Sequence, residues 1–387
     1  MLPSQADRFA LPPDRHYLNA AYMSPILRAG EAAAAAGLRQ RRDPSVLGPD
    51  DFFADADRVR DRFARLVGSP EAASGVALSP AVSYAMATVA QNLDVARGAR
   101  IVVLEGQFPS HVYPWRRLAA DAGAEVVTVA APGPLGTPGR GAEWNARLLD
   151  AIDGQTAVVA VPPLHWADGT LFDLEAVGAR AREVDAALVV DGTQSVGARP
   201  FSLEAVRPDA LACAAYKWLL GPYGLGVAWY GERFADGRPL EEGWIGRAGS
   251  DDFAGLTDYE DAYGPGAVRY DVGERSNGVL LPWLVAGLDQ LLDWGVAAVQ
   301  ERCDALADRI VEGARALGYG AEDGPYRAGH LFGLAPPAGV PVEAVRQSLA
   351  ARAVSVSVRG PALRVSPHVY NDEGDVEALL DALASAR

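Results

Sequence analysis

Cysteine is scarce in this sequence. The 387 residues include only two, Cys213 and Cys303. They form no Cys-x-x-Cys pair, and no spacing of cysteine and histidine is typical of a zinc site, so no metal centre is expected. Two isolated cysteines fit a reducing compartment, and a cytoplasmic protein is therefore expected.

Positive charge is also in short supply. Lys and Arg together number 35 against 50 Asp and Glu, which gives a formal net charge of −15. A chain this acidic gains little from a phosphate backbone and is repelled by anionic membranes, so neither nucleic acid nor a membrane is expected as a partner. An anionic ligand would need a local cationic pocket.

Several familiar signatures are absent as well. No apolar run reaches the length of a membrane span, and the N-terminus lacks the basic start and apolar core of a signal peptide. There is no Walker motif and no GxSxG nucleophile elbow. The glycines of GPYGLG lack the spacing of a dinucleotide fingerprint, which argues against a nicotinamide dehydrogenase; Gly221 and Gly224 are expected to form a turn.

Short apolar runs alternate with helical stretches in the first two thirds of the chain. The runs cover 101–104, 125–129, 157–161, 187–190 and 210–214. Such runs suit strands buried on both faces, so the pattern predicts an α/β fold with a mainly parallel sheet between helices. A further strand at 225–230 follows a tight turn and is expected to be antiparallel.

Three regions are expected along the chain: an N-terminal arm over 1–24, a large domain over 25–278 and a small α/β domain over 279–387 that the arm supports. The last begins with two long predicted helices, 279–294 and 296–317. Ser79-Pro80 indicates a helix start, with a capping hydroxyl followed by proline at the first helical position.

Two strand ends carry chemically suggestive residues. The run 187–190 leads into Asp191-Gly192-Thr193-Gln194, and 210–214 leads into Tyr216-Lys217-Trp218. Ligands bind beyond the carboxyl ends of parallel strands. A buried carboxylate beside a buried lysine is costly unless both serve a ligand.

Pyridoxal 5′-phosphate (PLP) requires such a set. It needs a lysine that can lose its proton, a carboxylate facing the pyridine nitrogen, a neutral donor near the ring oxygen, an aromatic face and a helix N-terminus for the phosphate. In that order, Lys217, Asp191, Gln194, Phe108 and the turn over 79–83 could fill these roles.

The sequence also resembles a known family. The run DGTQSVGARPFSLEAVRPDALACAAYKWLLGPYGLG is similar to the core of class V aminotransferases, which include cysteine desulfurases, kynureninases and isopenicillin N epimerase-like enzymes. HYLNAAYMSP, LPWLVAGLDQLLDWG and LRVSPHVYNDEGDVEALLDAL resemble its arm, its long helix and its C-terminal end. The resemblance implies a fold-type I PLP-dependent transferase with a seven-stranded sheet, acting as a homodimer with shared active sites.

The resemblance assigns roles around the cofactor. It implies that Lys217 forms the internal aldimine and then shuttles the α-proton of an amino-acid substrate. Asp191 would pair with the pyridine nitrogen, Gln194 would lie near the ring oxygen and Phe108 would stack on the ring. Tyr216 would contact the phosphate. Plain core packing remains open for Phe108.

Further residues are implied at the phosphate. Ala81 and Val82 would offer backbone N–H groups, with Ser79 or Ser83 supplying a hydroxyl. Trp244 and Asn277 would reach the phosphate from a second subunit, although either could be an ordinary loop residue.

At the substrate, the resemblance implies that Arg364 clamps the carboxylate, because a guanidinium can bind it with two parallel hydrogen bonds. An ion pair with a surface acid is the alternative for Arg364. Asn19 of the arm and His111 are placed near the substrate.

Two departures from the family narrow the reaction. The stretch VSVSVRGPALRVSP has no cysteine where desulfurases carry the catalytic one, and His111 stands where kynureninases have an acid. Phe108, Trp244 and Asn277 resemble residues of the kynureninases, and on that resemblance the leading hypothesis is a β-lyase that splits a C–S or C–C bond through an α-carbanion (quinonoid) intermediate. An aminotransferase is the alternative, followed by an epimerase and a non-catalytic PLP-fold protein.

Overall fold

The computed structural model describes residues 2–386, and its centre is a seven-stranded sheet. β8 is antiparallel to both of its neighbours, and the other pairs are parallel. This confirms the mainly parallel sheet and the antiparallel strand expected at 225–230. The sheet order is β2 (Val76–Ser79), β8 (Gly226–Tyr230), β7 (Ala210–Ala214), β6 (Ala187–Asp191), β5 (Thr156–Val161), β3 (Arg100–Leu104) and β4 (Glu125–Val129).

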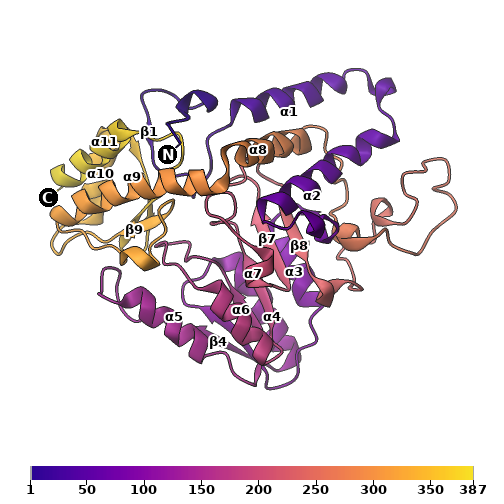
Figure 1. The fold of residues 1–387 in the computed structure, drawn as a ribbon, viewed down its shortest axis with the longest axis horizontal. Coiled ribbons are helices and arrows are strands. Elements are labelled where there is room, and N and C mark those ends of the chain that lie inside the picture. The colour runs from indigo at the N-terminus through magenta and orange to yellow at the C-terminus, as the bar shows by residue number, and fades with distance from the viewer. Residues whose placement is uncertain (1, 387) are drawn as a thin grey trace.

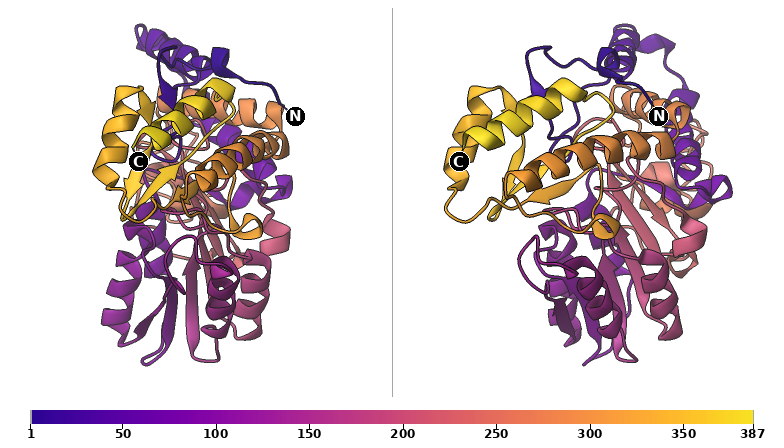
Figure 2. Two further views of the ribbon diagram at one scale, coloured as in Figure 1. Left: turned by 90° about the vertical axis from the view of Figure 1, so that its left-hand side faces the viewer. Right: turned by 60° about the vertical axis from the view of Figure 1, so that its left-hand side comes forward.

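Helices cover both faces of this sheet (Figure 2). Val158 and Val189 face one apolar core, whereas Val159 and Leu188 face the other. Because both faces are buried, the strands read as continuous apolar runs. One core is closed by α3 (Val82–Gln91) and α4 (Tyr113–Ala122), and the other by α2 (Ala54–Leu66), α5 (Arg140–Asp150), α6 (Leu174–Glu183), α7 (Leu203–Val206) and α8 (Leu280–Trp294).

The C-terminal part has its own core and a three-stranded antiparallel sheet of order β11-β12-β9. Its elements are α9 (Val296–Ala316), β9 (Phe332–Leu334), α10 (Val342–Ala351), β10 (Val354–Ser355), β11 (Ser357–Arg359), β12 (Ala362–Val365) and α11 (Glu373–Ser385). The arm strand β1 (His16–Tyr17) pairs with β10 beside these elements (Figure 1). α1 (Arg28–Gln40) follows the arm. The boundaries at 24 and 278 stay predictions.

The start of α3 differs from the sequence prediction. Ser79 ends β2, and its hydroxyl donates to the Ala81 carbonyl oxygen at 2.7 Å. The helix begins at Val82 with no side-chain cap. Ser79 therefore does not cap α3, because its oxygen is turned toward the preceding loop.

Within residues 2–386, no helix is long and apolar enough to span a membrane. No cluster of three or more His, Cys, Asp or Glu side chains suited to a metal ion occurs in that stretch.

Candidate active site

A cavity of about 230 Å³ opens at the carboxyl ends of the parallel strands. Its walls come from the segments that follow β2, β3, β5, β6 and β7, which bring distant parts of the sequence together. Residues at 80–83, 107–111, 162–166, 191–194, 214–217 and 223–225 contribute to the lining. This is the position at which open α/β sheets bind their ligands.

Lys217 lies in the turn after β7 and is buried in the cavity wall. Its Nζ is 5.5 Å from the centroid of the Phe108 ring and 5.4 Å from that of Tyr216. Burial lowers the pKa of Lys217 from 10.5 to about 8, and although the charge of Asp191 raises it, that of Arg364 lowers it further. Lys217 is also the only lysine of the whole sequence.

Asp191 ends β6 and, like Lys217, lines the cavity. Its Oδ1 accepts a hydrogen bond from the Thr193 backbone N–H at 3.0 Å. Thr193 Oγ1 in turn accepts from the Ala214 backbone N–H at 3.1 Å, which ties the end of β6 to the end of β7. Thr193 is not among the site residues predicted from the sequence, although it lies inside the Asp191–Gln194 motif.

The Gln194 side chain is held at both ends of its amide. Nε2 donates to the Ala21 carbonyl oxygen at 3.1 Å, and Oε1 accepts from Trp218 Nε1 at 2.9 Å. Gln194 thus fastens the N-terminal arm to the turn that carries Lys217, while still lining the cavity.

Aromatic groups form a further wall. Phe108 meets the Trp166 ring edge to face, with centroids 5.4 Å apart and planes at 82°. Trp166 is not among the site residues predicted from the sequence, although its position shortly after β5 is a signal that indicates such a role. His111 is fully buried, and its Nδ1 accepts from Trp115 Nε1 at 3.4 Å. Burial lowers the pKa of His111 to about 4, against an opposing effect of Asp191, so the ring is neutral.

The N-terminus of α3 opens into the cavity. Ala81, Val82 and Ser83 all contribute to the lining. The first amide groups of a helix have no partner within the helix, and without a side-chain cap they are available to an anion. Ser83 lines the cavity, and its hydroxyl group is available to a ligand. The Ser79 hydroxyl is not, because it already donates to the Ala81 carbonyl oxygen. The Tyr216 ring, which also lines the cavity, lies against that of Tyr223 with centroids 4.7 Å apart.

Arg364 lies on β12 and is 1 % exposed. Nη1 donates to the Trp166 carbonyl oxygen at 3.1 Å and Nη2 to Ser357 Oγ at 3.4 Å, while Nε has no partner. Burial and the charge of Arg359 lower its pKa to about 9. Within residues 2–386 no carboxylate pairs with Arg364, as would suit a guanidinium awaiting an anionic ligand. Asn19 is linked to Arg364 through Ser357, because Ser357 Oγ donates to Asn19 Oδ1 at 2.8 Å.

Trp244 and Asn277 lie outside the cavity of this chain. Arg364 and Asn19 are not among its lining residues either, although Arg364 contacts the lining residue Trp166. Trp244 is 43 % exposed and packs edge to face on Phe253. Asn277 Oδ1 accepts from the backbone N–H groups of Val279 and Leu280, each at 3.0 Å, in the turn that leads into α8. A contribution of either residue to a second subunit's site stays a prediction.

The residues present fit PLP. The cavity combines a lysine of lowered pKa, a neighbouring carboxylate, an aromatic wall and an uncapped helix N-terminus. Each corresponds to one part of the cofactor: aldehyde, pyridine nitrogen, ring face and phosphate.

Residues 50–243 match the sequence model of the family described as aminotransferase class-V. The chain belongs to this family. As a member it is a PLP-dependent enzyme, and the seven-stranded sheet with its C-terminal α/β part is the fold-type I arrangement.

Relatives in this family carry different activities. An uncharacterized aminotransferase of Bacillus subtilis (strain 168) is 25 % identical over 333 residues, which is 84 % of this chain and 82 % of that protein. Isopenicillin N epimerase of Amycolatopsis lactamdurans is 28 % identical over 358 residues, 87 % and 88 % of the two chains. A kynureninase of Burkholderia pseudomallei (strain K96243) is 26 % identical over 317 residues, 79 % and 72 % of the two.

Solved structures share the fold at lower identity. The apo cysteine desulfurase of Thermococcus onnurineus NA1 matches with a TM-score of 0.82 and 20 % identity, covering 99 % of this chain and 98 % of that one. The cystine C–S lyase C-DES, in complex with cysteine persulfide, matches with a TM-score of 0.85 and 18 % identity, covering 96 % and 98 %. At these identities the likeness establishes the fold alone.

Proposed function

We propose that the enzyme is a β-lyase, which cleaves a C–S or C–C bond at the β-carbon of an amino acid. The observation that carries the proposal is Lys217. It is a buried amine of lowered pKa that lines the same cavity as Asp191, at the carboxyl ends of the parallel strands. Bound there, PLP would supply an electron sink for the negative charge that develops at the substrate's α-carbon.

Each side chain has a separate task in this proposal. The lowered pKa of Lys217 favours the neutral amine, and neutral Nζ is the base that takes the α-proton. Asp191, an anion, stabilises positive charge on the pyridine nitrogen. Arg364 holds the substrate carboxylate, and the first turn of α3 holds the phosphate. Phe108 closes the wall over the ring.

The cysteines argue for elimination rather than for sulfur transfer to a protein thiol. Cys213 and Cys303 are both buried, and burial raises the pKa of each thiol. A thiol without thiolate character or access is a poor nucleophile. A β-lyase needs no such thiol, since S-substituted cysteine and water give a thiol, pyruvate and ammonia.

An aminotransferase is the second candidate, favoured by the relative from Bacillus subtilis. An epimerase would need a proton donor opposite Lys217. Of the two rings that lie against Nζ, Phe108 at 5.5 Å has no exchangeable proton, whereas Tyr216 at 5.4 Å carries a phenol. We also propose a cytoplasmic homodimer in which Trp244 and Asn277 reach the partner's site.

The test is an absorbance spectrum of the purified protein with S-substituted cysteines, alongside Lys217→Ala. Pyruvate formation with the yellow cofactor band retained supports the lyase. If the yellow band bleaches and a keto acid restores it, the enzyme is an aminotransferase instead. If the substrate racemises with neither pyruvate formation nor bleaching, it is an epimerase. A protein that takes up no PLP refutes all three.

A further inference from the structure

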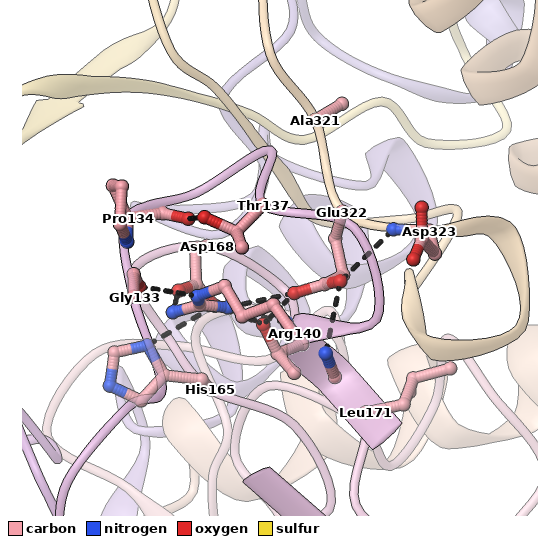
Figure 3. A network of polar contacts seen from close by, with 12 residues as sticks. Gly133, Pro134, Thr137, Arg140, His165, Asp168, Leu171, Ala321, Glu322 and Asp323 are labelled. Atoms are coloured by element: carbon pink, nitrogen blue, oxygen red, sulfur yellow. Dashed lines mark hydrogen bonds and ion pairs between the residues drawn. The ribbon is translucent and has the colours of Figure 1, made fainter. Parts of the chain in front are cut away.

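A buried arginine outside the cavity joins two acids from distant parts of the chain (Figure 3). Arg140, the first residue of α5, is 5 % exposed. Its Nη2 donates to Asp168 Oδ2 at 2.8 Å, and its Nη1 donates to Glu322 Oε2 at 2.7 Å and to Thr170 Oγ1 at 2.8 Å. Removing one member of such a set leaves a buried charge unpaired, which is costly.

Asp168 and Glu322 belong to different parts of the fold. Asp168 lies in the turn that follows β5, whereas Glu322 lies between α9 and β9. The geometry of the ion set therefore fixes the turn after β5 against the C-terminal part of the chain. The planar guanidinium is suited to this task, because its two ends reach two carboxylates in one fixed arrangement.

The turn over 165–170 is tightly closed. The Thr170 backbone N–H donates to Asp168 Oδ1 at 3.0 Å, and the Gly169 N–H donates to the His165 carbonyl oxygen at 2.8 Å. Trp166, the second residue of the turn, lines the cavity and donates from Nε1 to the Gly106 carbonyl oxygen at 2.7 Å. Fixing Asp168 thus fixes Trp166.

This turn determines where Arg364 lies, in two ways. The Trp166 carbonyl oxygen accepts a hydrogen bond from Arg364 Nη1 at 3.1 Å. The other acceptor of this guanidinium within residues 2–386 is Ser357 Oγ. The Asp168 carbonyl oxygen accepts from the Gly333 N–H at 2.8 Å, and Gly333 is the residue opposite Arg364 in the β9–β12 pair. Both the side chain and the strand of Arg364 are therefore placed against the turn.

We propose that Arg140 is a positioning residue for recognition of the substrate carboxylate. It touches no substrate; it holds the turn over 165–170 through Asp168 and Glu322, and the turn holds Arg364. The inference rests on the proposed function, because it assumes an amino-acid substrate whose carboxylate Arg364 binds. It makes Arg140 a determinant of selectivity for amines that carry an α-carboxylate.

The test compares two probes that differ only in the carboxylate. L-Alanine and L-alaninol are titrated into the PLP-loaded enzyme, and the change in cofactor absorbance gives each dissociation constant. Neither probe carries a β-leaving group, so the proposed lyase does not consume them. Arg140→Lys keeps the charge but loses the two-ended fork. Glu322→Gln keeps the shape but weakens the link. Arg147→Lys is the control, since Arg147 lies on the same helix and pairs at the surface with Glu143.

Arg140→Lys is expected to weaken the binding of L-alanine about tenfold and that of L-alaninol less than twofold. A small displacement of Arg364 lowers the affinity for the carboxylate alone, and L-alaninol has no carboxylate. Glu322→Gln should shift the ratio of the two dissociation constants in the same direction. This variant provides the test if Arg140→Lys does not fold. Equal weakening of both probes, or none, overturns the inference. A wild-type enzyme that binds PLP but responds to no amino acid overturns the proposed function instead, and this inference with it.

Discussion

The lowered pKa of Lys217 has a measurable effect on the stability of the cofactor-free protein. Its value of about 8, against 10.5 in the unfolded chain, corresponds to up to about 3 kcal/mol. Below pH 8 the amine is charged in both states, and the folded protein bears this whole cost. Between pH 8 and 10.5 the unfolded chain binds more protons, so the free energy of unfolding rises with pH.

Lys217→Met removes the buried charge and keeps most of the side-chain volume. The cofactor-free variant is expected to be more stable than the wild type by up to about 3 kcal/mol at pH 7, and the difference should vanish above pH 10.5. Denaturant unfolding at pH 7 and pH 11 measures both values. An unfolding free energy that is the same in both proteins at pH 7 would contradict the burial argument.

The pKa itself is directly accessible, because Lys217 is the only lysine. Reductive methylation with a carbon-13 label gives one lysine signal, distinct from the terminal amine, whose shift is followed with pH. A value near 8 is expected. Asp191→Asn should lower it further, since the carboxylate raises it, and Arg364→Gln should raise it. A wild-type value of 10 or more would refute the reasoning.

Three further outcomes are expected. Arg364→Gln should raise the dissociation constant of L-alanine by roughly ten- to a hundredfold while PLP uptake is unchanged, because the carboxylate loses its paired hydrogen bonds; unchanged L-alanine binding would exclude this arginine as the clamp. Gly169→Ala should lower the melting temperature by several degrees, since a Cβ there would lie 1.9 Å from the Leu331 carbonyl oxygen at a backbone φ of +75°; an unchanged melting curve would contradict the packing. Replacing Cys213 and Cys303 together by Ala should leave lyase turnover within about threefold of wild type; abolished turnover in a folded variant would point to a thiol mechanism.

Much of the sheet and part of the site followed from local patterns. The strands could be predicted because both of their faces are buried, so each is a continuous apolar run. Asp191 and Lys217 are far apart in sequence, but β6 and β7 are adjacent and parallel, so their carboxyl ends meet at one edge. Since ligands bind beyond the carboxyl ends of parallel strands, the sequence alone predicts that the two residues share one cavity.

Other features depend on contacts that no local pattern encodes. Arg140 and Glu322 are separated by 182 positions, and nothing near either one marks it as a partner of the other. The commitment of the Ser79 hydroxyl to the Ala81 carbonyl depends on the loop geometry after β2. The single lysine was visible in the sequence, and its rarity could have been used as a signal.

The most direct test of the central claim is borohydride reduction of the PLP-loaded enzyme, followed by peptide mapping. The account predicts that the yellow absorbance is lost and that a pyridoxyl group appears on the peptide that contains Lys217, with none incorporated in Lys217→Ala. Incorporation elsewhere, or an equal yellow band in the variant, would contradict it.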